Sequence, residues 1–254
     1  MVVMGMIAPY HGGGTGEKRE AIMRAVVIGA SGGIGGALAS RLAADERYEA
    51  VFGVSRSGRA PDGVTALQAD ITDLASLEAA AAAVGEPVDL CIVATGVLHD
   101  GFQPERSWRA LDPEHLRRDF EINAMGPALA ARAFLPLAPR QGRAVFAALS
   151  ARVGSIGDNR LGGWHSYRAS KAALNMILKT LSVELARTHP GMICVGLHPG
   201  TVDTALSEPF QKGVAPDKLF STDHSAFCLL GVINGLKQSD SGFVFDWKGD
   251  RITE

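Results

Sequence analysis

A tyrosine and a lysine, Tyr167 and Lys171, have the types and spacing that most directly suggest chemistry. They stand near the start of an amphipathic stretch, residues 166–188, whose pattern predicts a helix. On a helix, residues four apart share one face. A phenol with its pKa of ~10 is a poor base at neutral pH, but a neighbouring ammonium favours the phenolate and lowers that pKa. The pair therefore predicts a tyrosine that donates and accepts a proton.

Glycines gather where the first predicted strand gives way to the first predicted helix, in the run GASGGIGG at residues 29–36. Side chains are disfavoured where the backbone passes close to a phosphate, and a helix N-terminus presents free N–H groups and partial positive charge to an anion. The alternative is a merely tight turn. We expect the diphosphate of a dinucleotide to bind at Gly29, Ser31, Gly33, Ile34 and Gly35.

The end of the second predicted strand favours a phosphorylated cofactor. Ser55, Arg56 and Ser57 follow that strand, and no Asp or Glu stands at its tip. An acidic residue there would bind a ribose 2′-hydroxyl, whereas an arginine suits a 2′-phosphate. We therefore expect NADP(H) rather than NAD(H), with Arg56, alone or together with Arg59, on the phosphate. A solvated surface arginine is the alternative.

Apolar runs alternate with helical patterns from residue 23 onward. Wholly apolar runs predict strands buried on both faces, at residues 25–28, 50–54, 88–93, 144–149, 192–197 and 243–245, with a weaker run at 64–67. The helical patterns lie between them, at residues 34–44, 74–84, 113–137, 166–188 and 225–236. This alternation predicts a doubly wound α/β fold, an open parallel sheet with helices on both faces. We expect one such domain over residues 23–254 and a disordered extension at residues 1–22.

Charge and composition exclude several classes of function. The formal net charge of −2 over 254 residues removes the long-range attraction that nucleic acid or an anionic membrane would need. No apolar run approaches the ~18 residues of a membrane span. The cysteines Cys91, Cys194 and Cys228 are odd in number and far apart, which favours reduced thiols in a cytoplasmic protein.

The sequence gives no sign of a metal centre. Its seven histidines lack the spacing of a metal site, so we interpret them, His115 included, as surface or capping residues. We also interpret the mixed charges Glu114, Arg117, Arg118 and Glu121 as a solvated helix face.

In order along the chain, these segments resemble the short-chain dehydrogenase/reductase family, from about residue 23 to the C-terminus. Further segments match it. The turn at residues 70–73 resembles the family's adenine-contacting turn, and Asn123 falls at the helix asparagine that holds a proton-relay water. Residues 199–204 resemble the Pro-Gly-x-Val-x-Thr segment that cradles the nicotinamide and the diphosphate.

The resemblance implies a Rossmann sheet of seven strands, hydride transfer to or from a nicotinamide, and catalysis by Asn123, a serine, Tyr167 and Lys171. Lys171 would also hydrogen-bond the nicotinamide ribose. A homodimer or homotetramer would pair through residues 113–137 and 166–188. The remaining cofactor contacts that it implies are Asp70, Ile71, Ala94, Gly96, Pro199, Gly200, Val202 and Thr204.

The chain departs from the family at two places. The segment Asn-Asn-Ala-Gly of the family reads Val93-Ala94-Thr95-Gly96 here, so the bracing asparagines are missing. The family's catalytic serine is second in Ser-Ser-x-x-Gly, and counting back from Gly154 puts Ala151 in its place. Neighbouring side chains on a strand face opposite ways, so three possibilities remain open: Ser150, Ser155 in a lengthened loop, or no serine at all.

Two functions follow from these observations. The first is NADP(H)-dependent reduction of a ketone or aldehyde, or the reverse reaction, on a small and partly apolar substrate covered by a lid at residues 204–222. The second is dinucleotide binding for signalling or redox sensing, with weak or no turnover. The stretch Ser150-Ala151-Arg152 and the tail at residues 246–250 resemble the C-signal/Sniffer-like carbonyl reductase branch, whose members act in cell–cell signalling and development.

Overall fold

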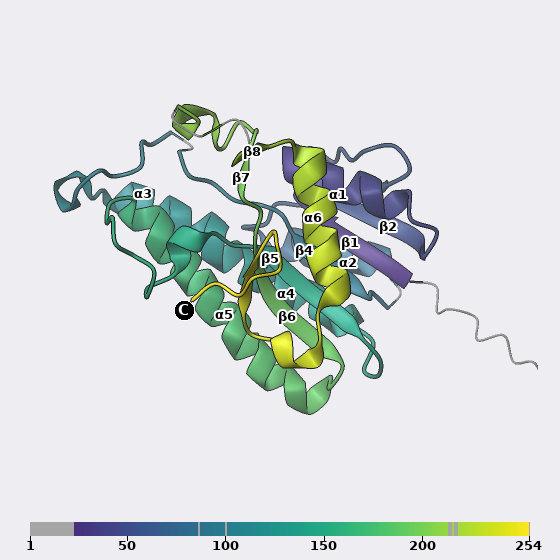
Figure 1. Ribbon diagram of the computed structural model, residues 1–254. Coiled ribbons are helices and arrows are strands. Elements are labelled where there is room, and N and C mark those ends of the chain that lie inside the picture. Colours follow the sequence, from purple (N-terminus) through teal and green to yellow (C-terminus); the bar gives the residue numbers. More distant parts are fainter. Residues whose placement is uncertain (1–22, 86, 100, 213–214, 216–217, 254) are drawn as a thin grey trace, which may run out of the picture.

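The computed structural model describes residues 23–85, 87–99, 101–212, 215 and 218–253 (Figure 1), so the extension expected at residues 1–22 lies outside the described residues. Its main sheet has seven parallel strands in the order β3-β2-β1-β4-β5-β6-β9. This confirms the predicted doubly wound fold. The strands are β1 (Met23–Ile28), β2 (Tyr48–Ser55), β3 (Thr65–Gln68), β4 (Leu90–Val93), β5 (Ala144–Leu149), β6 (Met192–His198) and β9 (Val244–Asp246).

Helices cover both faces of this sheet, with α1 and α6 on one side and α2, α4 and α5 on the other (Figure 1). A small parallel pair, β7 (Thr201–Val202) and β8 (Leu219–Phe220), follows β6. No helix in the described part of the chain is both long and apolar enough to cross a membrane. The α-helices are α1 (Gly33–Ala43), α2 (Leu74–Val84), α3 (Pro113–Phe120), α4 (Gly126–Phe134), α5 (His165–Thr188) and α6 (Thr222–Gly235).

The strands are continuously apolar because each buries side chains on both faces. Along β1, Val26 and Ile28 join the core beneath α2, α4 and α5, while Ala25 and Val27 join the core beneath α1 and α6. Successive side chains on a strand point to opposite faces. A central strand therefore cannot show the apolar–polar alternation of a strand with one wet face.

The helix expected at residues 113–137 is interrupted. After α3 the chain makes a π-helical turn, Glu121–Met125, before α4 begins, and a 3₁₀ turn, Leu135–Leu137, follows. Pro127 has no N–H, and its ring would clash with the carbonyl of Asn123 four residues earlier in a regular helix. The wider turn relieves that conflict and leaves Asn123 completely buried.

Candidate active site

Two cavities of about 410 Å³ and 640 Å³ lie at the carboxyl ends of the central strands. They are contiguous, because Gly32, Ala94 and Gly96 line both of them. Residues at the ends of β1 and β4 form their shared wall, and the strand order reverses between these two strands. Ligands of open α/β sheets bind at such a reversal, outside the carboxyl ends of the strands.

The start of α1 is open toward the cavities. Its N-cap residue is Gly32, so no side chain caps the first turn, and Gly33, Ile34 and Gly35 line the larger cavity. A helix N-terminus of this kind binds anions through its free N–H groups, and it fits the diphosphate of a dinucleotide. The tight turn itself explains the other glycines: Gly29 has a φ of 95°, and a Cβ at Gly35 would lie 2.2 Å from the Gly29 carbonyl oxygen.

Positive charge gathers at the end of β2. Arg56 and Arg59 line the smaller cavity. The hydroxyl of Ser55 donates to the Arg59 carbonyl at 2.8 Å and accepts from its N–H at 3.0 Å, which fixes the turn. Asp70 lines the same cavity, and hydrogen bonds from the backbone N–H and hydroxyl of Thr72 hold the pKa of its carboxyl below the usual value.

Tyr167 and Lys171 line the larger cavity from the first two turns of α5, and both are buried. The Lys171 ammonium donates to the Leu149 carbonyl at 2.7 Å and lies 5.7 Å from the centre of the Tyr167 ring. Burial lowers the pKa of Lys171 to about 8. It raises the pKa of Tyr167, and the carboxylate of Asp119 raises it further. The lowered tyrosine pKa expected from the sequence is therefore not found, because burial and Asp119 both raise the pKa of Tyr167.

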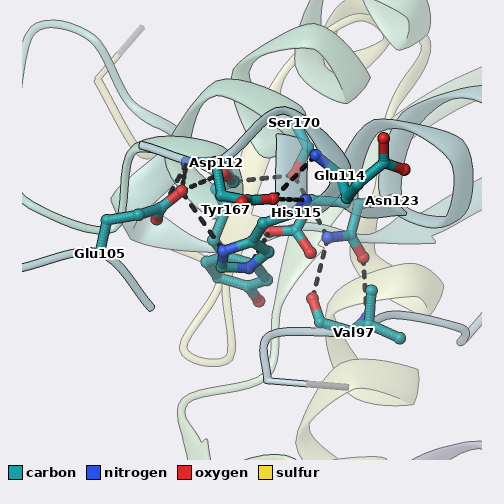
Figure 2. A network of polar contacts seen from close by, with 10 residues as sticks. Val97, Glu105, Asp112, Glu114, His115, Asn123, Tyr167 and Ser170 are labelled. Atoms are coloured by element: carbon teal, nitrogen blue, oxygen red, sulfur yellow. Dashed lines mark hydrogen bonds and ion pairs between the residues drawn. The ribbon is translucent and has the colours of Figure 1, made fainter. Parts of the chain in front are cut away.

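Asn123 lies behind the cavity wall and links α5, the helix that carries Tyr167 and Lys171, to the segment after β4. Its Oδ1 accepts from the Val97 N–H at 2.9 Å, and its Nδ2 donates to the Val97 carbonyl at 2.9 Å and to the Ser170 hydroxyl at 3.2 Å (Figure 2). A Cβ at Gly96 would lie 3.4 Å from Asn123 Oδ1 and 3.5 Å from Lys171 Nζ. The backbone thus passes directly over both polar groups. A relay water at Asn123 stays a prediction.

Residues 23–215 match the short chain dehydrogenase family. The chain belongs to that family. C-signal of Myxococcus xanthus is 36% identical over 169 residues, 65% of this chain and 92% of the relative. The 1-hydroxy-2-glutathionyl-2-methyl-3-butene dehydrogenase of Rhodococcus sp. is 33% identical over 180 residues, 68% of this chain and 73% of the relative. The NADPH-bound carbonyl reductase structure from chicken fatty liver is 26% identical with a TM-score of 0.79, covering 92% of this chain and 94% of that one.

These findings confirm the predicted family and the likeness to carbonyl reductases. This short-chain dehydrogenase is an NAD(P)-dependent oxidoreductase. Most of the residues predicted from the sequence meet at the two cavities. Those that line a cavity wall are Gly29, Ser31, Gly33, Ile34, Gly35, Arg56, Asp70, Ile71, Ala94, Gly96, Ser150, Tyr167, Lys171, Pro199 and Thr204.

Three predicted residues are not at the wall. Asn123 lies behind it, as described, and Val202 is buried in β7. Gly200 has a φ of 81°, and a Cβ there would lie 2.7 Å from the ring of Phe220. Aromatic packing therefore explains the glycine at 200. Of the predicted lid, residues 204–206 line the larger cavity, whereas residues 213–214 and 216–217 lie outside the described residues.

Ala151, which counting back from Gly154 predicted at the serine position of the family, carries no side-chain group that could hydrogen-bond to a carbonyl. Ala151 packs with Leu98 and Tyr167 in a small apolar cluster. Ser150 also lines the larger cavity, but its hydroxyl donates to Asn175 Oδ1 at 2.6 Å. Ser155 is buried away from the wall and accepts from the Asp158 N–H at 3.0 Å. Of the two candidate serines, the structure therefore brings only Ser150 to the cavity.

Part of this wall and a buried network behind it were not predicted from the sequence. Thr95, Val97, Leu98 and His99 line the larger cavity. These residues could have been predicted to line the site, because they directly follow β4, at the carboxyl edge where such sheets bind ligands. The network contains Glu105, His115 and Asp119.

The interpretation of His115 as a surface or capping residue is wrong, since it is 3% exposed. His115 lies 3.4 Å from Glu105 and 3.6 Å from Asp119, and these two carboxylates are equally buried (Figure 2). Burial, with the nearby charge of Glu105, raises the pKa of Asp119 to about 7. Of the charges interpreted as a solvated face, Glu114 and Arg117 are exposed on α3, whereas Arg118 lines the smaller cavity and Glu121 lies in the following π-helical turn. The opposite face of α3 buries polar groups.

Proposed function

We propose that this protein catalyses NADPH-dependent reduction of the carbonyl group of an aldehyde or ketone, with Tyr167 as the proton donor. The observation that supports it best is a single cavity that combines the Tyr167–Lys171 pair with the uncapped start of α1. A bound nicotinamide would supply the hydride. Tyr167 would donate its proton to the carbonyl oxygen, and its raised pKa keeps it a phenol at neutral pH. A phenol suits the reductive direction, because oxidation of an alcohol needs the phenolate as a base.

The other residues of the site assist this proton transfer. The ammonium of Lys171 stabilises the phenolate that Tyr167 becomes. Asn123 orders the water that returns a proton to the tyrosine. Ser150 orients the carbonyl only when its hydroxyl turns away from Asn175. The apolar walls formed by Leu98 and Leu206 favour a partly apolar substrate.

The preference for NADP(H) over NAD(H) rests on Arg56 and Arg59, which line the smaller cavity. The carbonyl reductase that this chain resembles is described as NADPH bound. We expect Arg56→Asp to weaken NADPH binding by roughly 10-fold or more relative to NADH, since hydrogen bonds to charged groups contribute ~1.5–3 kcal/mol. Fluorescence titrations with both cofactors measure this. An unchanged ratio would exclude Arg56 as the phosphate ligand.

The experiment that tests the activity is NADPH oxidation with benzaldehyde, acetophenone and menadione. Tyr167→Phe removes only the hydroxyl, so we expect kcat to fall by about 10³-fold, within the range of general acid catalysis, while NADPH binding stays intact. Turnover of Tyr167→Phe at the wild-type rate would show that another group donates the proton.

A second function is favoured by Ala151. As long as the Ser150 hydroxyl stays bonded to Asn175, one donor to the carbonyl oxygen is lost, which costs roughly 10²–10³-fold in rate in well-studied hydrolases. A dinucleotide-binding signalling or redox-sensing protein would tolerate that loss, and one relative is named C-signal. NADPH binding without turnover on any carbonyl compound would support this second function and exclude the first.

We also propose a cytoplasmic homodimer or homotetramer that pairs through α4 and α5. Met125, just before α4, and Met176 and Val183 on α5 are large apolar side chains that are 56%, 65% and 57% exposed. Pairing would cover them, and light scattering measures the mass of the assembly. Cys91 and Cys194 are buried free thiols, which suits a reducing compartment.

A further inference from the structure

The helix that holds Tyr167 and Lys171 begins without a capping side chain of its own. The N-cap residue of α5 is Trp164, whose side chain makes no capping hydrogen bond. Its φ of 51° makes it the only non-glycine residue with a positive φ in the described part of the chain, and it follows Gly162 and Gly163 at 64° and 66°. A large side chain in this conformation is strained. The first turn of α5 must therefore be held from elsewhere.

Glu105, 61 positions before Ser166 in the sequence, accepts the hydrogen bonds of the first turn of α5 in place of the missing cap. Both of its carboxylate oxygens lie 3.3 Å from the Ser166 N–H, and the Ser166 hydroxyl donates to Oε1. The Glu105 carbonyl also accepts from the Trp164 N–H at 2.5 Å. A buried carboxylate is costly unless it is hydrogen-bonded, and the partial positive charge of a helix N-terminus stabilises it further. Glu105 therefore acts as the N-cap that α5 lacks.

Helix α3 supports Glu105 from behind. His115 lies with Nδ1 at 3.4 Å from Glu105 Oε1, and its ring stacks on Phe102 at 4.9 Å between centroids and 4° between planes. Figure 2 shows Glu105 and His115 directed toward one another beside Tyr167. With backbone bonds on one side and a stacked imidazole on the other, the carboxylate has little freedom to move.

We propose that Glu105 is a positioning residue for the reaction: it sets the position of the Tyr167 hydroxyl in the larger cavity. Ser166 directly precedes Tyr167, so the group that holds Ser166 determines the direction in which the first turn places the phenol. The strained turn at residues 162–164 supplies no capping hydrogen bond, and Trp164 meets Tyr167 only through an edge-on ring contact at 6.4 Å between centroids. This inference rests on the proposed function of Tyr167 as the proton donor. The competing explanation is that Glu105 only stabilises the fold.

Three variants separate these explanations. Glu105→Ala removes the carboxylate, and Glu105→Gln keeps an oxygen that can accept an N–H bond. Ile233→Val is the matched control, because Ile233 is 2% exposed in α6, in the core on the other side of the sheet, and losing its methyl group lowers stability without touching α5. Thermal melts, steady-state kinetics with NADPH and menadione, and amide hydrogen exchange are measured for each.

We expect kcat of Glu105→Ala to fall about 10²-fold, as a misplacement of ~1 Å does, while KM for NADPH changes less than about twofold, since α1 is untouched. Glu105→Gln should recover kcat to within about 10-fold of the wild type, because a neutral acceptor replaces a charged one. Amides of residues 166–170 should exchange faster in Glu105→Ala and unchanged in Ile233→Val. If Glu105→Ala does not fold, Ser166→Ala, which removes one donor to the same carboxylate, should lower kcat and leave KM.

A Glu105→Ala protein with a lower melting temperature, wild-type kcat and unchanged exchange at residues 166–170 would overturn the inference. Wild-type protein that binds NADPH and reduces nothing would instead refute the proposed function. In that case unchanged exchange at residues 166–170 refutes the positioning role, whereas faster exchange confined to the first turn of α5, with NADPH binding unchanged, shows that Glu105 holds that turn.

Discussion

The first turns of α1 and α5 line the same cavity, and neither has a capping side chain at its own N-cap residue. At α1 the N-cap is Gly32, and the turn faces the cavity. At α5 the corresponding place is filled by the carboxylate of Glu105. Both ends have the same partial positive charge. We infer from this difference that the start of α1 is left open for the proposed cofactor, whereas the start of α5, which carries the proposed proton donor, is capped by the protein itself.

The largest effect at the start of α1 is expected from Gly32→Asp, which would place a carboxylate at its N-cap. Gly32 has the extended backbone of an N-cap residue, and a Cβ there would approach only the Gly29 carbonyl oxygen, at 3.4 Å. The change should raise stability by a few tenths of a kcal/mol at most. It should weaken NADPH binding by about 10²-fold, because placing like charges together costs several kcal/mol.

Gly32→Asn is the matched control, since it provides a neutral cap of the same shape. We expect it to weaken NADPH binding by less than about 10-fold, because no like charge is introduced. Calorimetric titration measures both variants. Equal losses of affinity in the two would mean that crowding, and not charge, excludes the cofactor.

A pH titration tests the α5 end of the cavity. Burial lowers the pKa of Lys171 to about 8, so its ammonium is charged below that pH and neutral above it. The charged form stabilises the phenolate left by proton donation, and kcat for reduction should therefore decline as pH rises through about 8. In Lys171→Met, kcat should be low and show no such decline. A wild-type rate that holds constant to pH ~10, the ordinary range for lysine, would contradict this role.

The smallest expected effect concerns the charge behind Tyr167. The pKa of Asp119 is raised to about 7, so its contribution to stability is present below pH ~4 and lost as pH rises through about 7. Glu105 and His115 face it within the network, Arg118 lies beside it on α3, and Lys171 approaches from α5. Asp119→Asn should gain on the order of 1 kcal/mol over the wild type at pH 8 and much less at pH 5. Denaturant unfolding at both pH values measures this, and an equal gain at both would refute the raised pKa.

The sequence predicted most of the fold because buried parallel strands are continuously apolar and the helices between them are amphipathic. It did not predict the π-helical turn Glu121–Met125, because the segments on either side of it, α3 and α4, are too short for a shift in the phase of their apolar positions to stand out. Pro127 could have indicated this turn, because proline has no N–H to donate to the carbonyl of Asn123. The glycine run and the Tyr167–Lys171 pair were found because both are local in sequence.

The network behind Tyr167 was missed because its members look like surface residues. His115 and Asp119 are four apart and share a face of α3, but the opposite face is polar as well, so no contrast marks the buried one. Glu105 lies far from α5 in sequence, and nothing near it indicates a helix N-terminus. A cap contributed by a distant segment becomes visible only in three dimensions.

Because Glu105, and not the loop before the helix, caps α5, that loop is open to engineering. The loop at residues 155–164 connects the segment after β5 to α5, and its last three residues have left-handed backbone conformations. The first turn of α5 is held by Glu105. The length and composition of the loop can therefore be varied by loop grafting while α5 stays held, provided that Gly163, Glu105 and Trp164, whose ring meets that of Tyr167 edge-on, are kept. A Cβ at Gly163 would lie 3.2 Å from the Glu105 carbonyl oxygen, and the Gly163 carbonyl accepts from Arg168 Nε at 3.0 Å, so the exchangeable segment ends before Gly163.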